Sequence, residues 1–113
     1  MARGQYLADF EIFVMAALAH LGEDAYGMTI RQEIESRSGR SVAIGAVYAT
    51  LERLNAKGYV RFHTSDPRPM QGGRSRKHAC LTPLGRRTLD EATTMLLRML
   101  PTPSPLTSKK GSR

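Results

Sequence analysis

Residues 44–60 read IGAVYATLERLNAKGYV, and this stretch decides the fold. Apolar side chains recur in it at intervals of three and four, which places one set on a single helical face: Ile44, Val47, Leu51 and Leu54. The remaining faces carry small side chains, one phenol, and two cations towards the end of the stretch. These residues are Gly45, Ala46, Tyr48, Ala49, Thr50, Arg53 and Lys57. A solvated helix usually carries more charge. We therefore expect the outer face to meet a partner that approaches the backbone closely.

Two further helices are predicted ahead of this stretch. The first covers Asp9 to Leu21, with Asp9 as its cap and Gly22 as the glycine that ends it. It is apolar nearly all round, so it is expected to be buried on more than one side, with the second side facing another subunit. The second helix covers about residues 25–37. Three helices joined by short, glycine-bearing turns are typical of a helix-turn-helix core.

Beyond Gly58 the apolar spacing changes from that of a helix to that of a strand. Residues 59–64 and 77–81 alternate between apolar and polar side chains, which predicts two strands. The segment between them, residues 65–76, is basic and rich in Pro and Gly. The sequence therefore predicts a hairpin with a long tip.

The chain ends with a predicted helix and a basic tail. Thr82-Pro83 combines a hydroxyl cap with a proline at the first helical position, so the last helix is predicted over residues 83–100. Heptad-like spacing, typical of a helix that packs on a partner helix, is kept by Leu89, Ala92, Leu96 and Met99. Residues 101–113, PTPSPLTSKKGSR, are expected to be disordered.

The order of elements is therefore helix, helix, helix, hairpin, helix. This order predicts a fold that is mainly α with a small β-hairpin, a winged helix-turn-helix plus a C-terminal dimerisation helix. The winged helix-turn-helix domain would cover residues 1–82, the dimerisation helix residues 83–100 and the tail residues 101–113. A chain of 113 residues has room for one modest core, and a core of that size gains burial when two copies pair.

Charge and composition narrow the function. The formal net charge is +7, and residues 1–58 hold six Lys and Arg against seven Asp and Glu, whereas residues 59–113 hold eleven against three. A basic side usually meets a polyanion such as nucleic acid. The single cysteine, Cys80, fits a reducing compartment. The chain shows no signal-peptide pattern and no run of the roughly 20 apolar residues that cross a bilayer, so we expect a cytoplasmic protein without a membrane part.

Together these features predict a protein that binds double-stranded DNA. The small outer face of the third helix lets its backbone sit deep in the major groove, where base edges are read. Contacts of this helix are assigned to Ser41, Ile44, Gly45, Ala46, Tyr48, Ala49, Thr50, Arg53 and Lys57. Contacts of the wing, which follows the DNA backbone, are assigned to Arg68, Gly72, Gly73, Arg74, Arg76 and Lys77. A two-fold dimer then implies an operator that is an inverted repeat.

Three segments resemble the PadR-type transcriptional regulators: AYGMTIRQEIE at 25–35, IGAVYATLERLNAKGYV at 44–60 and GGRSRKHACLTPLGRRTL at 72–89. The short length is similar to the compact subgroup with a single final helix. The resemblance implies a homodimeric winged-helix repressor that dimerises through its C-terminal helix. The family often has Gly-Thr-Leu-Tyr where residues 45–48 of this chain read Gly-Ala-Val-Tyr, so one threonine contact with DNA is missing here.

Dimer contacts are assigned to the first and last helices, at Phe13, Leu89, Ala92, Leu96 and Met99. In the PadR family, effectors are often flat aromatic or drug-like compounds held at the dimer interface. The resemblance therefore implies an apolar or aromatic small-molecule effector. Met95 and Met99 are candidates to line its pocket, because methionine adapts to irregular shapes. The alternative is that both are plain interface core.

Other interpretations stay open beside this one. A winged-helix module that docks its basic surface on an acidic protein would lack the steep salt dependence of DNA binding. Double-stranded RNA is disfavoured, because its major groove does not admit a helix. His63, His78 and Cys80 share one side of the hairpin, a weak pattern for a metal site, and no metal or other cofactor is expected. An enzyme is not indicated, because the sequence shows neither a nucleophile with an obvious base nor paired carboxylates.

Overall fold

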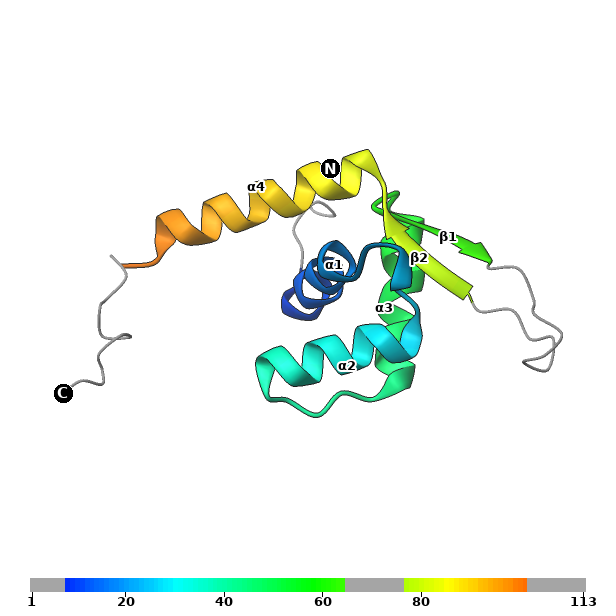
Figure 1. Cartoon of the computed structure of the whole chain (residues 1–113). Helices are drawn as coiled ribbons and strands as arrows, with labels where there is room; N and C mark the ends of the chain where they lie inside the picture. Colours follow the sequence, from blue (N-terminus) through cyan, green and yellow to red (C-terminus); the bar gives the residue numbers. More distant parts are fainter. Residues whose placement is uncertain (1–7, 65–76, 102–113) are drawn as a thin grey trace, which may run out of the picture.

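The computed structural model describes residues 8–64 and 77–101. Its elements follow the predicted order (Figure 1): α1 (Asp9–Leu21), a short 3-10 helix η2 (Gly22–Asp24), α2 (Gly27–Ser38), α3 (Ile44–Ala56), β1 (Val60–Thr64), β2 (Lys77–Leu81) and α4 (Pro83–Met99). The predicted fold class, mainly α with a small β-hairpin, is therefore confirmed. The predicted wing tip, residues 65–76, lies outside the described residues, and so does the predicted disordered tail, residues 101–113, apart from its first residue.

The first three helices pack around one apolar core. Helix α1 contacts both α2 and α3, and the hairpin closes the core from the side (Figure 1). The largest apolar side chains that are fully shielded from solvent are Val14, Met15, Ile30, Val47, Leu51, Leu54 and Val60. They come from α1, α2, α3 and β1, so the helix-turn-helix core and the base of the wing form one packed unit.

The hairpin is antiparallel and is tied to the helices at one edge. Phe62 pairs with Ala79 across the two strands. The N–H of Ala79 also donates to the carbonyl oxygen of Ala25 over 2.9 Å, and Tyr26 forms an isolated β-bridge with His78. The connection between η2 and α2 therefore lies beside β2 as a strand-like segment, which fixes the base of the wing against the helical core.

The start of α4 is anchored on the turn that follows α3. Thr82 caps α4 as predicted, since its hydroxyl accepts from the N–H of Gly85 over 2.9 Å. The same hydroxyl donates to the carbonyl of Gly58 over 2.7 Å, and the N–H of Thr82 donates to the carbonyl of Tyr59 over 3.0 Å. A Cβ on Gly85 would stand 2.0 Å from that Tyr59 oxygen. A glycine is therefore required where α4 crosses the backbone of Tyr59.

Helix α4 has a half that packs on the body and a half that projects away from it (Figure 1). Leu89 is 7% exposed and belongs to the core of the monomer. Its assignment as a dimer contact is therefore wrong, because the helix has not yet left its own domain at that residue. Farther along, large apolar side chains are exposed: Met95, Leu96, Leu97, Met99 and Leu100. No helix among the described residues is long and apolar enough to span a bilayer.

The N-cap of α1 and the segment that follows the helix differ from the sequence expectations. Ala8 is the N-cap, and Asp9, predicted to cap the helix, is its first residue. Gly22 ends α1 with a positive φ of 60°, as predicted. The chain then continues into η2 rather than directly into the next helix, so α2 begins only at Gly27.

Candidate nucleic-acid interface

The outer face of α3 is small and open to solvent. Gly45, Ala46, Tyr48 and Ala49 are all exposed, and helical geometry places them on one side of the helix; we call them the small face. Around the position that a Cβ on Gly45 would occupy, no other part of the described structure comes within 4 Å. Ser41, ahead of the helix, is exposed as well, and Ile44 is half-buried at its start. A partner can therefore approach the α3 backbone closely at this end.

Tyr48 is held in place by a glycine on the neighbouring helix. Its side chain is 45% exposed, yet its phenol lies against Gly27 at the start of α2. A Cβ on Gly27 would stand 2.3 Å from the phenol oxygen. Tyr48 is a predicted DNA contact and Gly27 lies in the segment 25–35, but the sequence gives no sign that the two residues touch. The contact fixes the ring at the edge of the small face while leaving part of it open to solvent.

Thr50 does not belong to the small face. It is 2% exposed, and its hydroxyl accepts from Nη2 of Arg53 over 3.1 Å. The prediction that Thr50 contacts DNA is therefore wrong. Thr50 follows Val47 by three residues and precedes Leu54 by four, so helical spacing itself places it on the inward stripe.

The two cations at the end of α3 turn towards a buried carboxylate. Glu11, in the first turn of α1, is 3% exposed. Its Oε2 lies 2.9 Å from Nζ of Lys57 and 3.6 Å from Nε of Arg53, and its Oε1 accepts from the N–H of Ala8 over 2.9 Å. Burial raises the pKa of Glu11, but these three groups lower it by more, so the pKa stays below its ordinary value. An ionised Glu11 therefore engages Arg53 and Lys57, which are two of the residues that were predicted to contact DNA.

Glu11 is the site residue that sequence reasoning missed. The signal lay in its position, three residues before Val14 and four before Met15, on the stripe that α1 buries. An acidic residue on such a stripe needs a cationic partner. Its partners lie on another helix, so the local pattern does not identify them.

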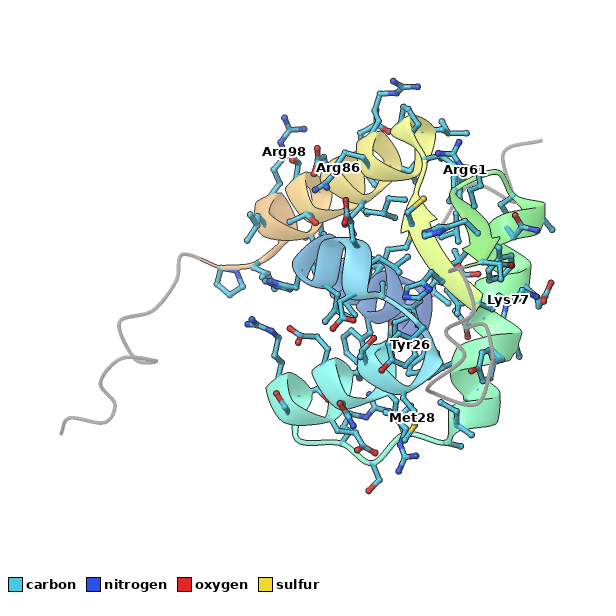
Figure 2. The ribbon with its side chains drawn as sticks, turned by 45° about the vertical axis from the view of Figure 1, so that its right-hand side comes forward. Tyr26, Met28, Arg61, Lys77, Arg86 and Arg98 are labelled. Atoms are coloured by element: carbon cyan, nitrogen blue, oxygen red, sulfur yellow. The ribbon has the colours of Figure 1, made fainter. Side chains whose placement is uncertain are left out.

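The base of the wing contributes one cation to the candidate interface. Nζ of Lys77 lies 4.3 Å from the centroid of the Phe62 ring and 3.5 Å from Oε2 of Glu52 on α3. Figure 2 shows Lys77 beside α3, with Arg86 and Arg98 along α4 on another side of the molecule. The other predicted wing residues lie outside the described residues: Arg68, Gly72, Gly73, Arg74 and Arg76.

The outer side of the hairpin brings the two predicted histidines together. His63 and His78 pair across the strands, and their rings stack with centroids 5.4 Å apart. The ring of Tyr26 meets His78 edge-on at 5.3 Å, and Cys80 follows on the same side of β2. Within residues 8–64 and 77–101, no cluster of three or more His, Cys, Asp or Glu side chains is placed to hold a metal ion. The arrangement is that of a packed aromatic contact.

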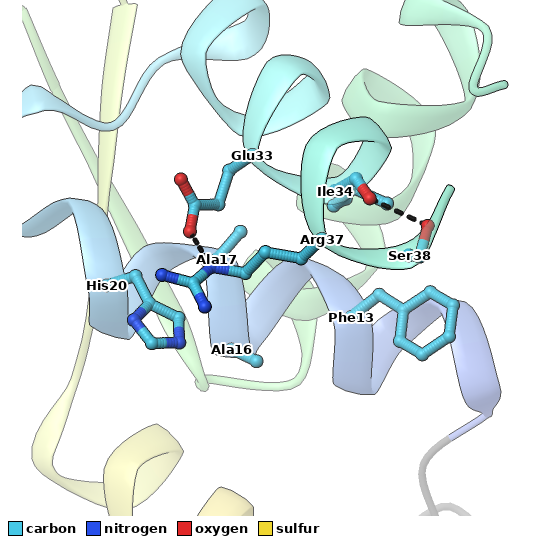
Figure 3. A pocket seen from close by; sticks show the side chains of 8 residues that line it. All are labelled: Phe13, Ala16, Ala17, His20, Glu33, Ile34, Arg37 and Ser38. Carbon is cyan, nitrogen blue, oxygen red and sulfur yellow. Dashed lines mark hydrogen bonds and ion pairs between the residues drawn. The ribbon is translucent and has the colours of Figure 1, made fainter. Parts of the chain in front are cut away.

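A pocket of about 300 Å³ opens between α1 and α2 (Figure 3). Phe13 and Ile34 contribute to its apolar lining, and Figure 3 shows Arg37 reaching over it from α2. Arg37 is ion-paired with Glu33 one turn earlier. Because the charge of Arg37 is already matched by Glu33, Arg37 adds no unpaired charge to the mainly apolar interior of the pocket.

Comparison with known proteins agrees with the described geometry. The model of the transcriptional regulator PadR-like family matches residues 16–91. A curated relative, an uncharacterised 37.1 kDa protein in transposon TN4556 of Streptomyces fradiae, is 32% identical over 91 residues, which are 80% of this chain and 24% of the relative. The chain thus spans about a quarter of the length of that relative.

Solved structures share the fold. A PadR-like transcription factor from Bacteroides fragilis superposes with a TM-score of 0.68 at 24% identity, over 80% of this chain and 82% of that one. A PadR family transcription regulator from Clostridium difficile gives a TM-score of 0.65 at 22% identity, over 81% of this chain and 91% of that one. At these identities the likeness concerns the fold alone, and it extends over about four fifths of this chain.

Proposed function

The chain belongs to the PadR-like family of transcriptional regulators, and we propose that it binds DNA sequence-specifically as a homodimeric repressor that a small-molecule effector releases from its operator. The observation that carries this proposal is the small face of α3. Gly45, Ala46 and Ala49 lie exposed on the helix that a winged helix-turn-helix inserts into the major groove. With so little side chain in the way, the helix backbone can approach the base edges that distinguish one sequence from another.

The rest of the interface would position this helix. Tyr48 supplies a hydroxyl near the groove edge, and Lys77 with Arg74 and Arg76 supplies the wing with positive charge for the phosphates. A two-fold dimer would present two copies of α3 about 34 Å apart, so the operator would be an inverted repeat with half-sites about ten base pairs apart. The protein would act by binding alone, in the cytoplasm, without catalysis or a cofactor.

A salt titration on random-sequence duplex DNA tests the proposal. With six or more phosphate contacts, affinity should fall about a thousandfold between about 50 and 200 mM salt, because binding releases condensed counterions. Fragments selected from genomic DNA should then share an inverted repeat. Absence of salt-dependent duplex binding, together with tight binding to an acidic protein, would favour the alternative function of a module that docks an acidic partner.

The exposed end of α4 supports the dimer. Leu96 and Met99 lie outside the core and face solvent, where a contiguous apolar surface marks an interaction site. Replacing both by glutamate should convert a dimer into a folded monomer, because a dimer interface cannot bury unpaired charges. Light scattering would report the mass, and circular dichroism would report the fold. Arg87→Glu, on an exposed position of the packed half of α4, is the control and should remain dimeric. A monomeric wild type at micromolar concentration would contradict the dimer.

The effector is proposed to be an apolar or aromatic small molecule bound at the dimer interface. Met95 and Met99 are exposed at the end of α4, where that interface would form. Their unbranched thioether side chains can rearrange around ligands of different shape. Binding there would change the distance between the two copies of α3, and so release the operator.

A further inference from the structure

We propose that Glu11 is a positioning residue that sets how strongly α3 prefers its operator over random DNA. The inference rests on the proposed function in DNA binding. By holding Lys57 and Arg53 against α1, Glu11 keeps two cations of the recognition helix away from phosphates. Phosphate contacts strengthen binding to every sequence alike. When Lys57 and Arg53 make no phosphate contacts, a larger share of the binding free energy comes from the contacts that read bases.

The carboxylate of Glu11 is gripped by groups from two helices. Nζ of Lys57 lies 3.2 Å from Oε1 and 2.9 Å from Oε2, so the ammonium bridges both oxygens. The N–H of Ala8 also donates to Oε1, and Nε of Arg53 lies 3.6 Å from Oε2. Nη2 of Arg53 donates to the buried hydroxyl of Thr50. Each cation therefore has an internal partner that holds it beside α1.

Burial differs between the carboxylate of Glu11 and its two cationic partners. The Glu11 side chain is almost completely buried, whereas the side chains of Lys57 and Arg53 are partly open to solvent. A buried carboxylate is stable only while cations and N–H donors surround it. The cations have an alternative in water or at a phosphate, but the carboxylate has none. The charge on Glu11 is thus what keeps them in place.

We call Glu11 with Lys57 and Arg53 the clamp, and its location matches the proposed role. It joins the first turn of α1 to the last turn of α3, where the negative end of one helix dipole meets the positive end of the other. The small face lies at the opposite end of α3, near its first turns. The clamp therefore restrains the end of the recognition helix that would otherwise add phosphate contacts, and leaves the base-reading end free.

Glu11→Gln tests the inference. The amide keeps the shape and can still accept from the N–H of Ala8, but it carries no charge to hold Lys57 and Arg53. Binding to a random-sequence duplex should tighten about tenfold at about 0.1 M salt, and the slope of log affinity against log salt should steepen by about 0.9 for each freed cation. Adding Lys57→Gln to Glu11→Gln should remove the share of the added slope that Lys57 supplies. A role in folding alone would not shift the slope in this way.

Glu33→Gln is the matched control. It removes the same charge but frees Arg37 on α2 rather than a cation of α3, so it should keep the wild-type slope. A wild-type slope in Glu11→Gln, measured beside salt-dependent binding by the wild type, would overturn the inference and leave the proposed function intact. Failure of the wild type itself to bind DNA would instead remove the proposed function, and the inference with it.

Thermal unfolding shows whether each variant is folded before its slope is read. If Glu11→Gln does not fold, Lys57→Gln alone decides the question. A clamped Lys57 makes no phosphate contact, so its loss should cost thermal stability and not salt slope. A slope shallower by about 0.9 would place Lys57 on the DNA already and would overturn the inference.

Discussion

An alanine in place of Gly85 is expected to lower the free energy of unfolding by about 3 kcal/mol, because overpacking costs about 1–3 kcal/mol and nearby hydrogen bonds of about 1 kcal/mol each are strained with it. The new Cβ would stand 2.0 Å from the carbonyl oxygen and 2.8 Å from the carbonyl carbon of Tyr59. Both are backbone atoms, which cannot turn aside as a side chain would. The start of α4 must then move, and the bonds of Thr82 to Gly58 and Tyr59 lengthen.

Thermal unfolding followed by circular dichroism would measure this loss, which corresponds to a fall in Tm of about 10–20 °C for a domain of this size. Gly45→Ala is the matched control, since a Cβ there enters open space. It should be neutral or stabilise α3 by about 0.5 kcal/mol, because glycine is unfavourable inside a helix. An unchanged Tm for Gly85→Ala would mean that α4 is not seated on Tyr59.

The elements of this fold could be predicted because their signals are local. The bounds of β2 match the sequence prediction at both ends, those of α1 match apart from the N-cap, and the cap at Thr82 follows from two adjacent residues. The third strand-like segment could not be predicted in the same way. It depends on a bond between Ala25 and Ala79, which are far apart in the sequence and carry no pairing signal of their own.

Heptad spacing illustrates the same limit in α4. The spacing indicates that one face of the helix is apolar, but it does not show where the helix leaves its own domain. Leu89 and Leu96 are equivalent in the repeat, yet the first is buried in the monomer and the second faces solvent. Their difference arises from the anchoring of α4 at Tyr59 and from its length beyond the body.

The sequence predicts the candidate interface only in part, because helical spacing shows which face a residue occupies but not which distant residues its side chain contacts. The small face follows from the inward stripe, which leaves Gly45, Ala46 and Ala49 outside it. Thr50 was predicted to lie outside that stripe, although its spacing from Val47 and Leu54 puts it inside. The partner of Lys57 could not be predicted at all, since it lies 46 residues away on another helix.

Replacing Ala49 by leucine should lower the ratio of operator affinity to random-DNA affinity by about a hundredfold. Ala49 lies exposed in the small face, one turn after Gly45 and next to Tyr48. The branched side chain of leucine would stand between the helix and the base edges, and each lost base contact costs about 1–3 kcal/mol. Random-DNA affinity should change little, because phosphate contacts are made elsewhere. Fold and dimer should persist, since Ala49 lies outside the core.

Ala56→Leu is the matched control for this experiment. Ala56 is exposed on the same side of α3, two turns later and about 10 Å farther along the helix axis at about 1.5 Å per residue. The first turns of a recognition helix read the bases, so Ala56→Leu should retain most of the specificity. Both variants would compete a labelled operator against random duplex at one fixed salt concentration, since affinity varies with salt. If Ala49→Leu bound its operator as well as the wild type does, α3 would not be the reading helix, and the wing would have to carry recognition alone.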